Sequence, residues 1–290
     1  MYLFADYSGA QKASAQRRAI RLAQASRRES PKLVEKRLTR EELVTELVSR
    51  LTEASRVGMR ACIGQDHQYS IPYKLAQELS ISHLSWRDAL RSLCSGSYGQ
   101  DAPALGHPRT FAASFNAWLV ARGLPAYFYS ATKGALYGIP SQDPRRGGDS
   151  RYRLTERFPS RSGKGSPKPL NRVGDNGSVG GQSLLGMAAL VDLLHRCECE
   201  GVRLAVWPFD GLSITGSMYA DAHVMIEPYP SAVRPTNVVQ TDDSDALAST
   251  GHTRDMDAAD QLAEQLDLSG VDDATAAVVR FEGWIVSHQP

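Results

Sequence analysis

Three acidic residues in this 290-residue sequence each close a short apolar run: Asp6, Asp66 and Glu227. An ionised carboxylate at the edge of a protein core costs several kcal/mol unless it is paired or binds a cation. Carboxylate oxygens are the ligands that Mg²⁺ and Mn²⁺ prefer. Two such ions about 4 Å apart can activate a water and stabilise the leaving oxygen in phosphodiester cleavage. These residues therefore predict a site for metal-dependent hydrolysis.

A fourth acid, Asp255, is expected to open a late helix and to join this group. Asp257 points to a different side of that helix and is a weaker candidate. Each acid also has a simpler interpretation, because a strand-end aspartate can accept turn amides and Asp255 could favour the helix dipole. Two carboxylates about 4 Å apart repel by roughly 4 kcal/mol at an effective dielectric near 20, so a converging set needs cations or protons. We expect one shared site made of Asp6, Asp66, Glu227 and Asp255, with a two-metal arrangement of Mg²⁺ or Mn²⁺ ions.

The elements that must position these acids begin with four short apolar runs, which predict strands over residues 2–6, 18–23, 32–36 and 60–66. A helix lies between the third and fourth runs. It starts at a capping box of Thr39 and Glu42, shows apolar residues at helical spacing, and ends at Gly58. Three strands, a helix and a strand, with carboxylates at two strand ends, match the opening of a ribonuclease H-like fold.

Residues 67–181 interrupt this pattern and predict a largely helical and irregular insertion. Its expected helices cover 73–79, 86–93 and 111–122. After it, the periodicity predicts a helix over 182–197, strands over 202–209 and 222–227, and helices over 255–266 and 273–286. We therefore expect one α/β domain with a ribonuclease H-like mixed sheet, whose core comprises residues 1–66 and 182–290.

The insertion contains a basic loop over residues 145–172, in which cationic side chains far outnumber Asp149 and Glu156. The loop could be a solvated surface insertion, or an arm that contacts the phosphates of a nucleic acid. The residues expected to bind nucleic acid are Arg145, Arg146, Arg151, Arg153, Arg157, Arg161, Lys164 and Lys168. In contrast, the segment 242–273 is strongly acidic.

Two other patterns invite a chemical interpretation and fit a structural one better. The glycine-rich run Gly174–Gly181 precedes a helix, but it lacks both the P-loop and the dinucleotide signatures, so close packing is the expected role. His195, Cys197 and Cys199 lack the usual zinc spacings and are expected to end an amphipathic helix. With Cys62 and Cys94, the four cysteines do not predict a disulfide framework in so long a chain.

The bulk composition sets only wide limits on function. The chain is 42% hydrophobic, which suffices for a sizeable core, and its net charge of +1 produces no global field toward nucleic acid or membranes. No apolar run approaches the roughly 20 residues of a membrane span. We expect a cytoplasmic protein without a membrane partner.

Several short motifs together resemble the predicted ribonuclease H-like nucleases of the family called domain of unknown function 429. They are spread over most of the chain: Ala5–Ala10, Ile63–Asp66 with Pro72, Arg153–Glu156, Ile226–Pro230, Gly251–Asp255 and Glu282–Ile285. The resemblance implies metal-bound acids at Asp6, Asp66, Glu227 and Asp255, and it implies no substrate. One departure is His67-Gln68, where apolar or aromatic residues are expected; His67 could support the site from behind or be a partly exposed loop residue.

Three functions are compatible with these patterns. The first is a divalent-metal-dependent phosphodiester hydrolase that acts on nucleic acid, motivated by the acids and the basic loop. The second is a nucleotide-binding phosphotransferase related to actin-like ATPases and sugar kinases, with Asp6, Ser8 and Gly9 at a phosphate turn; that architecture needs two such cores, and only one is evident. The third is a protein that binds a partner on a nuclease-like fold without catalysis.

Overall fold

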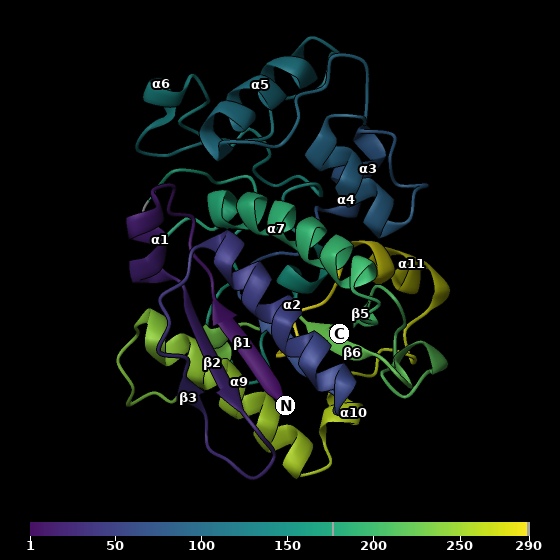
Figure 1. Ribbon diagram of the computed structural model, residues 1–290. Coiled ribbons are helices and arrows are strands. Elements are labelled where there is room, and N and C mark those ends of the chain that lie inside the picture. The colour runs from purple at the N-terminus through teal and green to yellow at the C-terminus, as the bar shows by residue number, and fades with distance from the viewer. Residues whose placement is uncertain (176, 289–290) are drawn as a thin grey trace.

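Six short strands form one mixed sheet in the computed structural model of the chain, which describes residues 1–175 and 177–288. The strands are β1 (Tyr2–Asp6), β2 (Arg21–Ala25), β3 (Lys32–Leu33), β4 (Cys62–Gln65), β5 (Leu204–Val206) and β6 (His223–Ile226). Their order across the sheet is β3-β2-β1-β4-β6-β5 (Figure 1). The expectation of an α/β protein with a mixed sheet is confirmed.

The pairing of the central strands determines which side chains meet. β1 is antiparallel to β2 and parallel to β4, and β4 is parallel to β6. The register pairs Ala5 with Gln65, and the Asp66 amide donates to the Ala5 carbonyl over 3.0 Å. The carboxyl ends of β1, β4 and β6 therefore lie together at one edge of the sheet.

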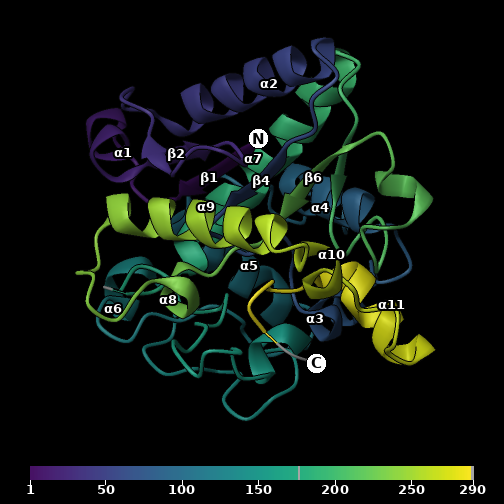
Figure 2. The ribbon, with the colours of Figure 1, turned by 90° about the horizontal axis from the view of Figure 1, so that it is seen from below.

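One face of the sheet is covered by α2 (Arg40–Arg56) and α7 (Gly180–Cys199), while α9 (Asp242–Ala258) covers the other (Figure 2). The capping box at the start of α2 is confirmed, because Thr39 accepts from the Glu42 amide and Glu42 accepts from the Thr39 amide. Alternate residues of β1 consequently serve different cores: Leu3 packs on the side of α2 and α7, and Phe4 packs on the side of α9.

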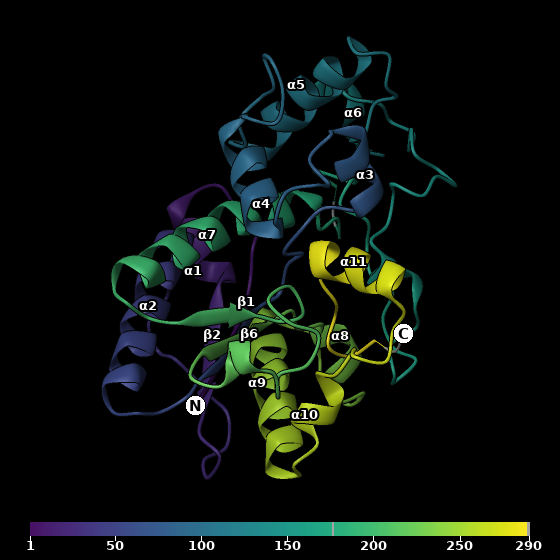
Figure 3. The same cartoon turned by 90° about the vertical axis from the view of Figure 1, so that its right-hand side faces the viewer.

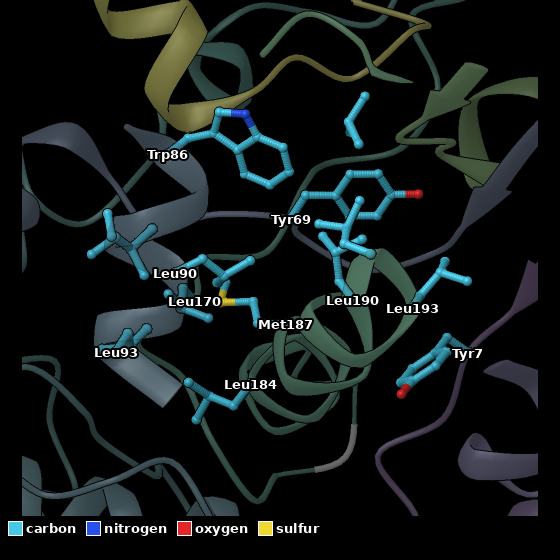
Figure 4. Close-up of a cluster of buried hydrophobic side chains, with 14 of the residues drawn as sticks. Tyr7, Tyr69, Trp86, Leu90, Leu93, Leu170, Leu184, Met187, Leu190 and Leu193 are labelled. Atoms are coloured by element: carbon cyan, nitrogen blue, oxygen red, sulfur yellow. The ribbon is translucent and has the colours of Figure 1, made fainter. Parts of the chain in front are cut away.

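The long helix α7 is the centre of the larger core. Leu184, Met187, Leu190 and Leu193 point from it toward neighbouring elements, with Tyr69 and the helix α4 on one side and Tyr7 on another (Figure 4). All of these side chains are buried. This packing holds the loop after β4 against the body of the protein.

The insertion is helical where it is regular and lies beyond the carboxyl end of β1 (Figures 1 and 3). Its elements are α3 (Tyr73–Glu78), α4 (Trp86–Ser95), α5 (Pro108–Val120), α6 (Gly134–Tyr137) and the 3₁₀ turn η1 (Leu154–Arg157). The three helices expected here are found, with ends displaced by a few residues. The insertion therefore stands over the edge of the sheet at which Asp6 and Asp66 lie.

Two expectations near the ends of the chain need correction. The run 18–23 is not one strand, because α1 (Ala13–Ala19) precedes β2 and only Ile20 separates them. The late helix does not start at Asp255: Thr241 caps α9 by accepting from the Ser244 amide, so the helix begins at Asp242. Residues 262–265 form the separate short helix α10.

The remaining elements connect the sheet to the end of the chain. The strand expected over 202–209 is limited to β5, and a 3₁₀ turn, η2 (Ser217–Tyr219), and a short helix, α8 (Pro230–Val233), flank β6. The last helix is α11 (Asp273–Glu282), shorter than expected because Gly283 follows with a φ of +82°. Within the described part of the chain, no helix is both long and apolar enough to cross a membrane.

Candidate functional site

Asp6 and Asp66 are neighbours at the edge of the sheet, as the parallel pairing of β1 and β4 requires. Both follow the same face of their strands as Phe4, the face that α9 covers. Asp6 is 8% exposed. Two of the four acids that the sequence predicted to converge therefore do lie together.

The start of α9 brings two further acids to this pair, Asp242 and Asp245. The Asp6 carboxyl is within hydrogen-bonding reach of both Asp66 and Asp242, and Asp245 is near enough to raise the pKa of Asp6 and of Asp66. Neither Asp242 nor Asp245 was predicted from the sequence as a site residue. The sequence feature that could have indicated them is the N-terminal cap of α9, formed by Thr241 and Ser244. This cap is hard to recognise because a serine stands where Glu or Gln is more common.

The protonation of this cluster reflects its burial. Burial raises the pKa of the Asp6 carboxyl, and the charges of Asp66, Asp242 and Asp245 raise it further. Burial also raises the pKa of Asp66 to about 7, with Asp245 and Glu227 adding to the effect. Near neutral pH, protons or cations must therefore neutralise part of the negative charge.

The neighbouring acids of α9 differ in whether a base compensates them. Asp243 is ion-paired with Arg21, and Asp245 with Arg234. Among the described residues, no ion pair with Lys, Arg or His reaches Asp6, Asp66 or Asp242. The excess negative charge therefore belongs mainly to Asp6 and Asp66, because the charge of Arg21 partly offsets that of Asp242.

Glu227 lies beside this cluster but is not free to join it. Its two oxygens accept from the two terminal nitrogens of Arg153 over 2.7 and 2.5 Å. The register also separates it, because Ile226 lies opposite Gly64, so Glu227 is level with Gln65 rather than Asp66 and follows the opposite face. The expectation that Glu227 is a metal ligand is not met, because both of its carboxylate oxygens are bound by Arg153.

Asp255 lies far from the other acids. Helix α9 runs antiparallel to β1: Asp242 is near Asp6, whereas Asp257 accepts a hydrogen bond from Tyr2 at the start of the strand. Thirteen residues of helix separate Asp255 from Asp242, or about 20 Å at 1.5 Å per residue. Asp255 is 65% exposed and paired with Arg254, so the prediction of a fourth ligand there was wrong.

A small cavity of about 50 Å³ opens next to the acids. Asp66, Glu227 and Arg153 line it together with Gln68, Lys168 and Tyr229. The segment 160–168 lies across this region and is held by its own contacts. Ser162 Oγ donates to the Ala232 carbonyl over 2.7 Å, and Gln68 donates to the Lys168 carbonyl over 3.2 Å.

His67 is buried rather than partly exposed, which corrects the expectation from the sequence. Its ring lies between those of Tyr7 and Tyr69, at centroid distances of 4.8 and 5.0 Å, and contacts Gln65 and the Gln68 carbonyl through its two nitrogens. Burial lowers the pKa of His67 to about 4. His67 is therefore neutral at pH 7 and brings no charge to the acids.

The residues expected to bind nucleic acid divide into two groups. Arg145 and Arg153 are buried, so the prediction was wrong for them: Arg145 pairs with Glu78 at 2.8 Å and donates to two backbone carbonyls. Arg151 lies 2.6 Å from Asp143 and Arg157 lies 3.5 Å from Asp149. The residues that are exposed or partly exposed are Arg146, Arg151, Arg157, Arg161, Lys164 and Lys168.

The other candidate patterns have structural roles in the described residues. A Cβ on Gly180 would lie 2.2 Å from the Leu170 carbonyl oxygen, so close packing explains this part of the glycine run; Asn176 within the run lies outside the described residues. On α7, Cys197 is buried and Cys199 is exposed, so the two cysteines face different ways.

The fit of the acids to a metal ion is therefore partial. Asp6, Asp66 and Asp242 offer the oxygen donors that Mg²⁺ or Mn²⁺ needs, and Asp6 and Asp66 have no ion-pair partner among the described residues. As they are placed, however, no three His, Cys, Asp or Glu side chains in residues 1–175 and 177–288 are arranged to hold a metal ion together. Comparison of this chain with protein-family models, with curated proteins and with solved structures found no match.

Proposed function

We propose that this chain is a divalent-metal-dependent phosphodiester hydrolase that acts on nucleic acid, with a ribonuclease H-like fold similar to the nucleases of domain of unknown function 429. The topology supports the fold: three antiparallel strands are followed by a helix and a strand parallel to the first. Ligands of such sheets bind at the carboxyl ends of parallel strands.

The observation that carries the proposal is the group of three carboxyls without an ion-pair partner: Asp6, which is buried, Asp66, which is partly buried, and Asp242, which is exposed. A protein that keeps such a group loses stability by it, which is expected where the acids serve a function. A bound Mg²⁺ or Mn²⁺ would remove the repulsion and supply Lewis-acid chemistry. Because no three acids are now arranged around a common point, binding requires their side chains to draw closer.

The surroundings support a phosphate-containing substrate. Lys168 lines the cavity that also contains Asp66, and Lys164 and Arg161 belong to the same segment. In this proposal Asp6, Asp66 and Asp242 hold the ion, and Lys168 offsets the charge of the phosphate that approaches it. The exposed cations of the segment 146–168 extend this contact along the nucleic acid.

The test is cleavage of labelled single-stranded, duplex, hybrid and branched nucleic acids in Mg²⁺ or Mn²⁺. Asp6→Asn and Asp66→Asn are each expected to lower cleavage by at least about 100-fold, the scale on which removal of one group that stabilises the transition state is felt. Asp255→Asn is the matched control, since its exposed carboxylate is expected to be irrelevant. Full cleavage by the Asp6→Asn protein would rule out the proposal.

One observation favours a second function, a partner-binding protein that has lost catalysis. In the described residues, no three His, Cys, Asp or Glu side chains are placed to hold a metal ion. Calorimetric titration with Mn²⁺ separates the two: binding that Asp66→Asn abolishes supports the hydrolase, and no binding at millimolar Mn²⁺ supports the non-catalytic protein.

A further inference from the structure

The cavity beside Asp66 is too small for the substrate that the proposed function requires. Its volume is about 50 Å³, whereas pockets that take small ligands measure about 300–1,000 Å³. A cavity of this size takes about one or two water molecules. A phosphate group of a nucleic acid therefore cannot enter beside Asp66 until one wall of the cavity moves.

One wall is Tyr229, and the segment 160–168 packs against its ring. Gly165 has a φ of +77°, and a Cβ on Gly165 would lie 2.7 Å from a ring carbon of Tyr229 and 2.8 Å from its hydroxyl oxygen. The Ser166 amide is within hydrogen-bonding reach of the same hydroxyl. Tyr229 therefore has little room to turn away from the cavity while Gly165 stays where it is.

The segment 160–168 is fixed at its two ends. Ser160 is buried and pairs with His288 in an isolated antiparallel bridge. At the other end, the Lys168 carbonyl accepts from the Gln68 side chain over 3.2 Å. The backbone between these ends can therefore move without releasing the segment from the protein.

The middle of the segment, residues 161–166, is held more weakly. Each of these residues is exposed or partly exposed. The Arg161 amide donates to the Ser287 carbonyl over 2.7 Å, and Ser162 Oγ donates to the Ala232 carbonyl over 2.7 Å. Segments with few buried contacts and exposed hydrogen bonds are the ones that open locally in a folded protein.

The charge of the segment gives a nucleic acid the means to open it. Its charged residues are Arg161, Lys164 and Lys168, and it contains no acid. A ligand shifts a conformational equilibrium only if it binds one of the two states better. A nucleic acid that pairs with these cations and also enters the cavity binds the open state better, since Tyr229 blocks the cavity in the closed state.

We infer that residues 160–168 form an autoinhibitory strap. In the free protein the strap holds Tyr229 against the cavity beside Asp66, and a nucleic acid enters the cavity only after the strap has moved off Tyr229. This inference rests on the proposed function, because it describes how access to the proposed site is regulated.

The test compares two glycines of the strap that share an unusual backbone conformation. Gly163 has a φ of +66° and Gly165 one of +77°, but only a Cβ on Gly165 meets Tyr229; among the described residues, nothing lies within 4 Å of one on Gly163. Gly165→Ala is therefore expected to push the strap off Tyr229, and Gly163→Ala is the matched control. In the full-length protein, hydrogen exchange over residues 161–166 should be about 10-fold faster in Gly165→Ala than in Gly163→Ala.

Cleavage of a labelled single-stranded oligonucleotide in Mn²⁺ measures access to the site. Gly165→Ala is expected to cleave at least about 3-fold faster than the wild type, and Gly163→Ala less than about 2-fold faster. Faster exchange in Gly165→Ala without faster cleavage would overturn this inference and leave the hydrolase standing. Unchanged exchange in Gly165→Ala would also overturn it. No cleavage by any of the three proteins would overturn the proposed function and the strap with it.

Ser162→Ala decides the question if Gly165→Ala does not fold. It removes the donor to the Ala232 carbonyl without adding an atom, so the strap should open more often. Cleavage is then expected to rise by about 2-fold or more, in a protein whose circular dichroism and Tm match those of the wild type. Cleavage equal to that of the wild type would overturn the inference.

Discussion

At the scale of single residues, Asp6 and Asp66 form the centre of the candidate site because no Lys, Arg or His among residues 1–175 and 177–288 forms an ion pair with them. Their neighbours on α9, Asp243 and Asp245, each have an arginine. A buried carboxyl pair without a base is destabilising when both members are ionised. The stability of the metal-free protein should therefore depend on the ionisation of these two groups.

The first prediction concerns Asp66. Its pKa is raised from the ordinary 3.8 to about 7, so its protonation favours the folded state, and this contribution is lost as the pH rises through about 7. In EDTA, Asp66→Asn should therefore be more stable than the wild type at pH 8, with a difference that shrinks toward pH 5. About 1 kcal/mol corresponds to roughly 2–4 °C in Tm for a chain of this size class.

The control is Asp255→Asn, whose exposed carboxylate should leave the pH profile of Tm unchanged. Adding Mg²⁺ or Mn²⁺ at pH 8 should raise the Tm of the wild type and not that of Asp66→Asn. If the Tm profiles of the wild type and Asp66→Asn run parallel from pH 5 to 8, the pKa of Asp66 is not raised in the folded protein.

Arg153 gives a second prediction at this scale. Arg153→Met removes the partner of two buried carboxylates, Glu156 and Glu227, and is expected to cost about 3–5 kcal/mol of unfolding free energy. Denaturant unfolding measures it. Arg157→Met is the matched control, since Arg157 is exposed and lies in the same turn η1, and it should change stability by no more than about 0.5 kcal/mol. Equal losses in the two variants would mean that the buried pairing contributes nothing.

At the scale of elements, the direction of α9 decides which acids reach the site. The helix begins beside Asp6 and runs back along β1 toward Tyr2, so its first turn supplies Asp242 and Asp245. The positive end of its dipole also lies at this turn and favours negative charge there. An acid in the last turn, such as Asp255, is carried to the opposite edge of the sheet.

The cap of α9 should therefore matter for both stability and metal binding. Thr241→Ala removes the side chain that accepts from the Ser244 amide and is expected to cost about 1 kcal/mol. Because fraying of the first turn moves Asp242, the affinity for Mn²⁺ should also fall, by several-fold in a calorimetric titration.

Ser85→Ala is the control for this experiment. Ser85 caps α4 in the same way, by accepting from the Asp88 amide. A similar loss of stability with unchanged Mn²⁺ affinity is expected for Ser85→Ala. If both variants lose affinity equally, general destabilisation is responsible and the position of α9 is not.

The sequence indicated the central elements well because their patterns are local. The apolar runs that end at Asp6, Asp66 and Glu227 are strands β1, β4 and β6, and the box of Thr39 and Glu42 does start α2. In α9 the pattern is weak, since polar residues and Gly251 occupy much of the helix. Its start was therefore placed too late, and Asp255 was chosen instead of Asp242.

At the scale of the whole molecule, buried polar contacts add to the apolar packing that attaches the insertion to the core. Glu282 at the end of α11 accepts from the Tyr73 amide at 2.5 Å and from the Leu154 amide. Tyr73 begins α3 and Leu154 begins η1, two separate parts of the insertion, so one carboxyl joins both to the last helix. This joint also holds the start of η1, which Arg153 directly precedes.

The last prediction tests this joint. Glu282→Ala leaves two backbone amides without an acceptor, at about 1–3 kcal/mol for each buried group. Hydrogen exchange should increase at Tyr73 and Leu154 more than in the strands of the sheet. Arg280→Ala, an exposed change on the same helix, should leave the exchange pattern as in the wild type. Exchange that rises uniformly in Glu282→Ala would indicate loss of the fold rather than of the joint.

Contacts of this range could not be predicted from the sequence. Arg153 was grouped with surface cations because its neighbours in the sequence are basic, while its partners Glu227 and Glu282 lie far along the chain. Arg145 was misplaced for the same reason, since its partner Glu78 lies at the end of α3, 67 residues earlier in the chain. Charge in a local window does not reveal whether folding will bury a side chain against a distant opposite charge.

The antiparallel course of α9 along β1 has a consequence for biosynthesis. Asp242 is synthesised 236 residues after Asp6, so the two acids become neighbours late in folding. Under the proposed function, a growing chain would carry isolated aspartates that do not yet share a site. The proposed activity would then arise only once the fold is complete.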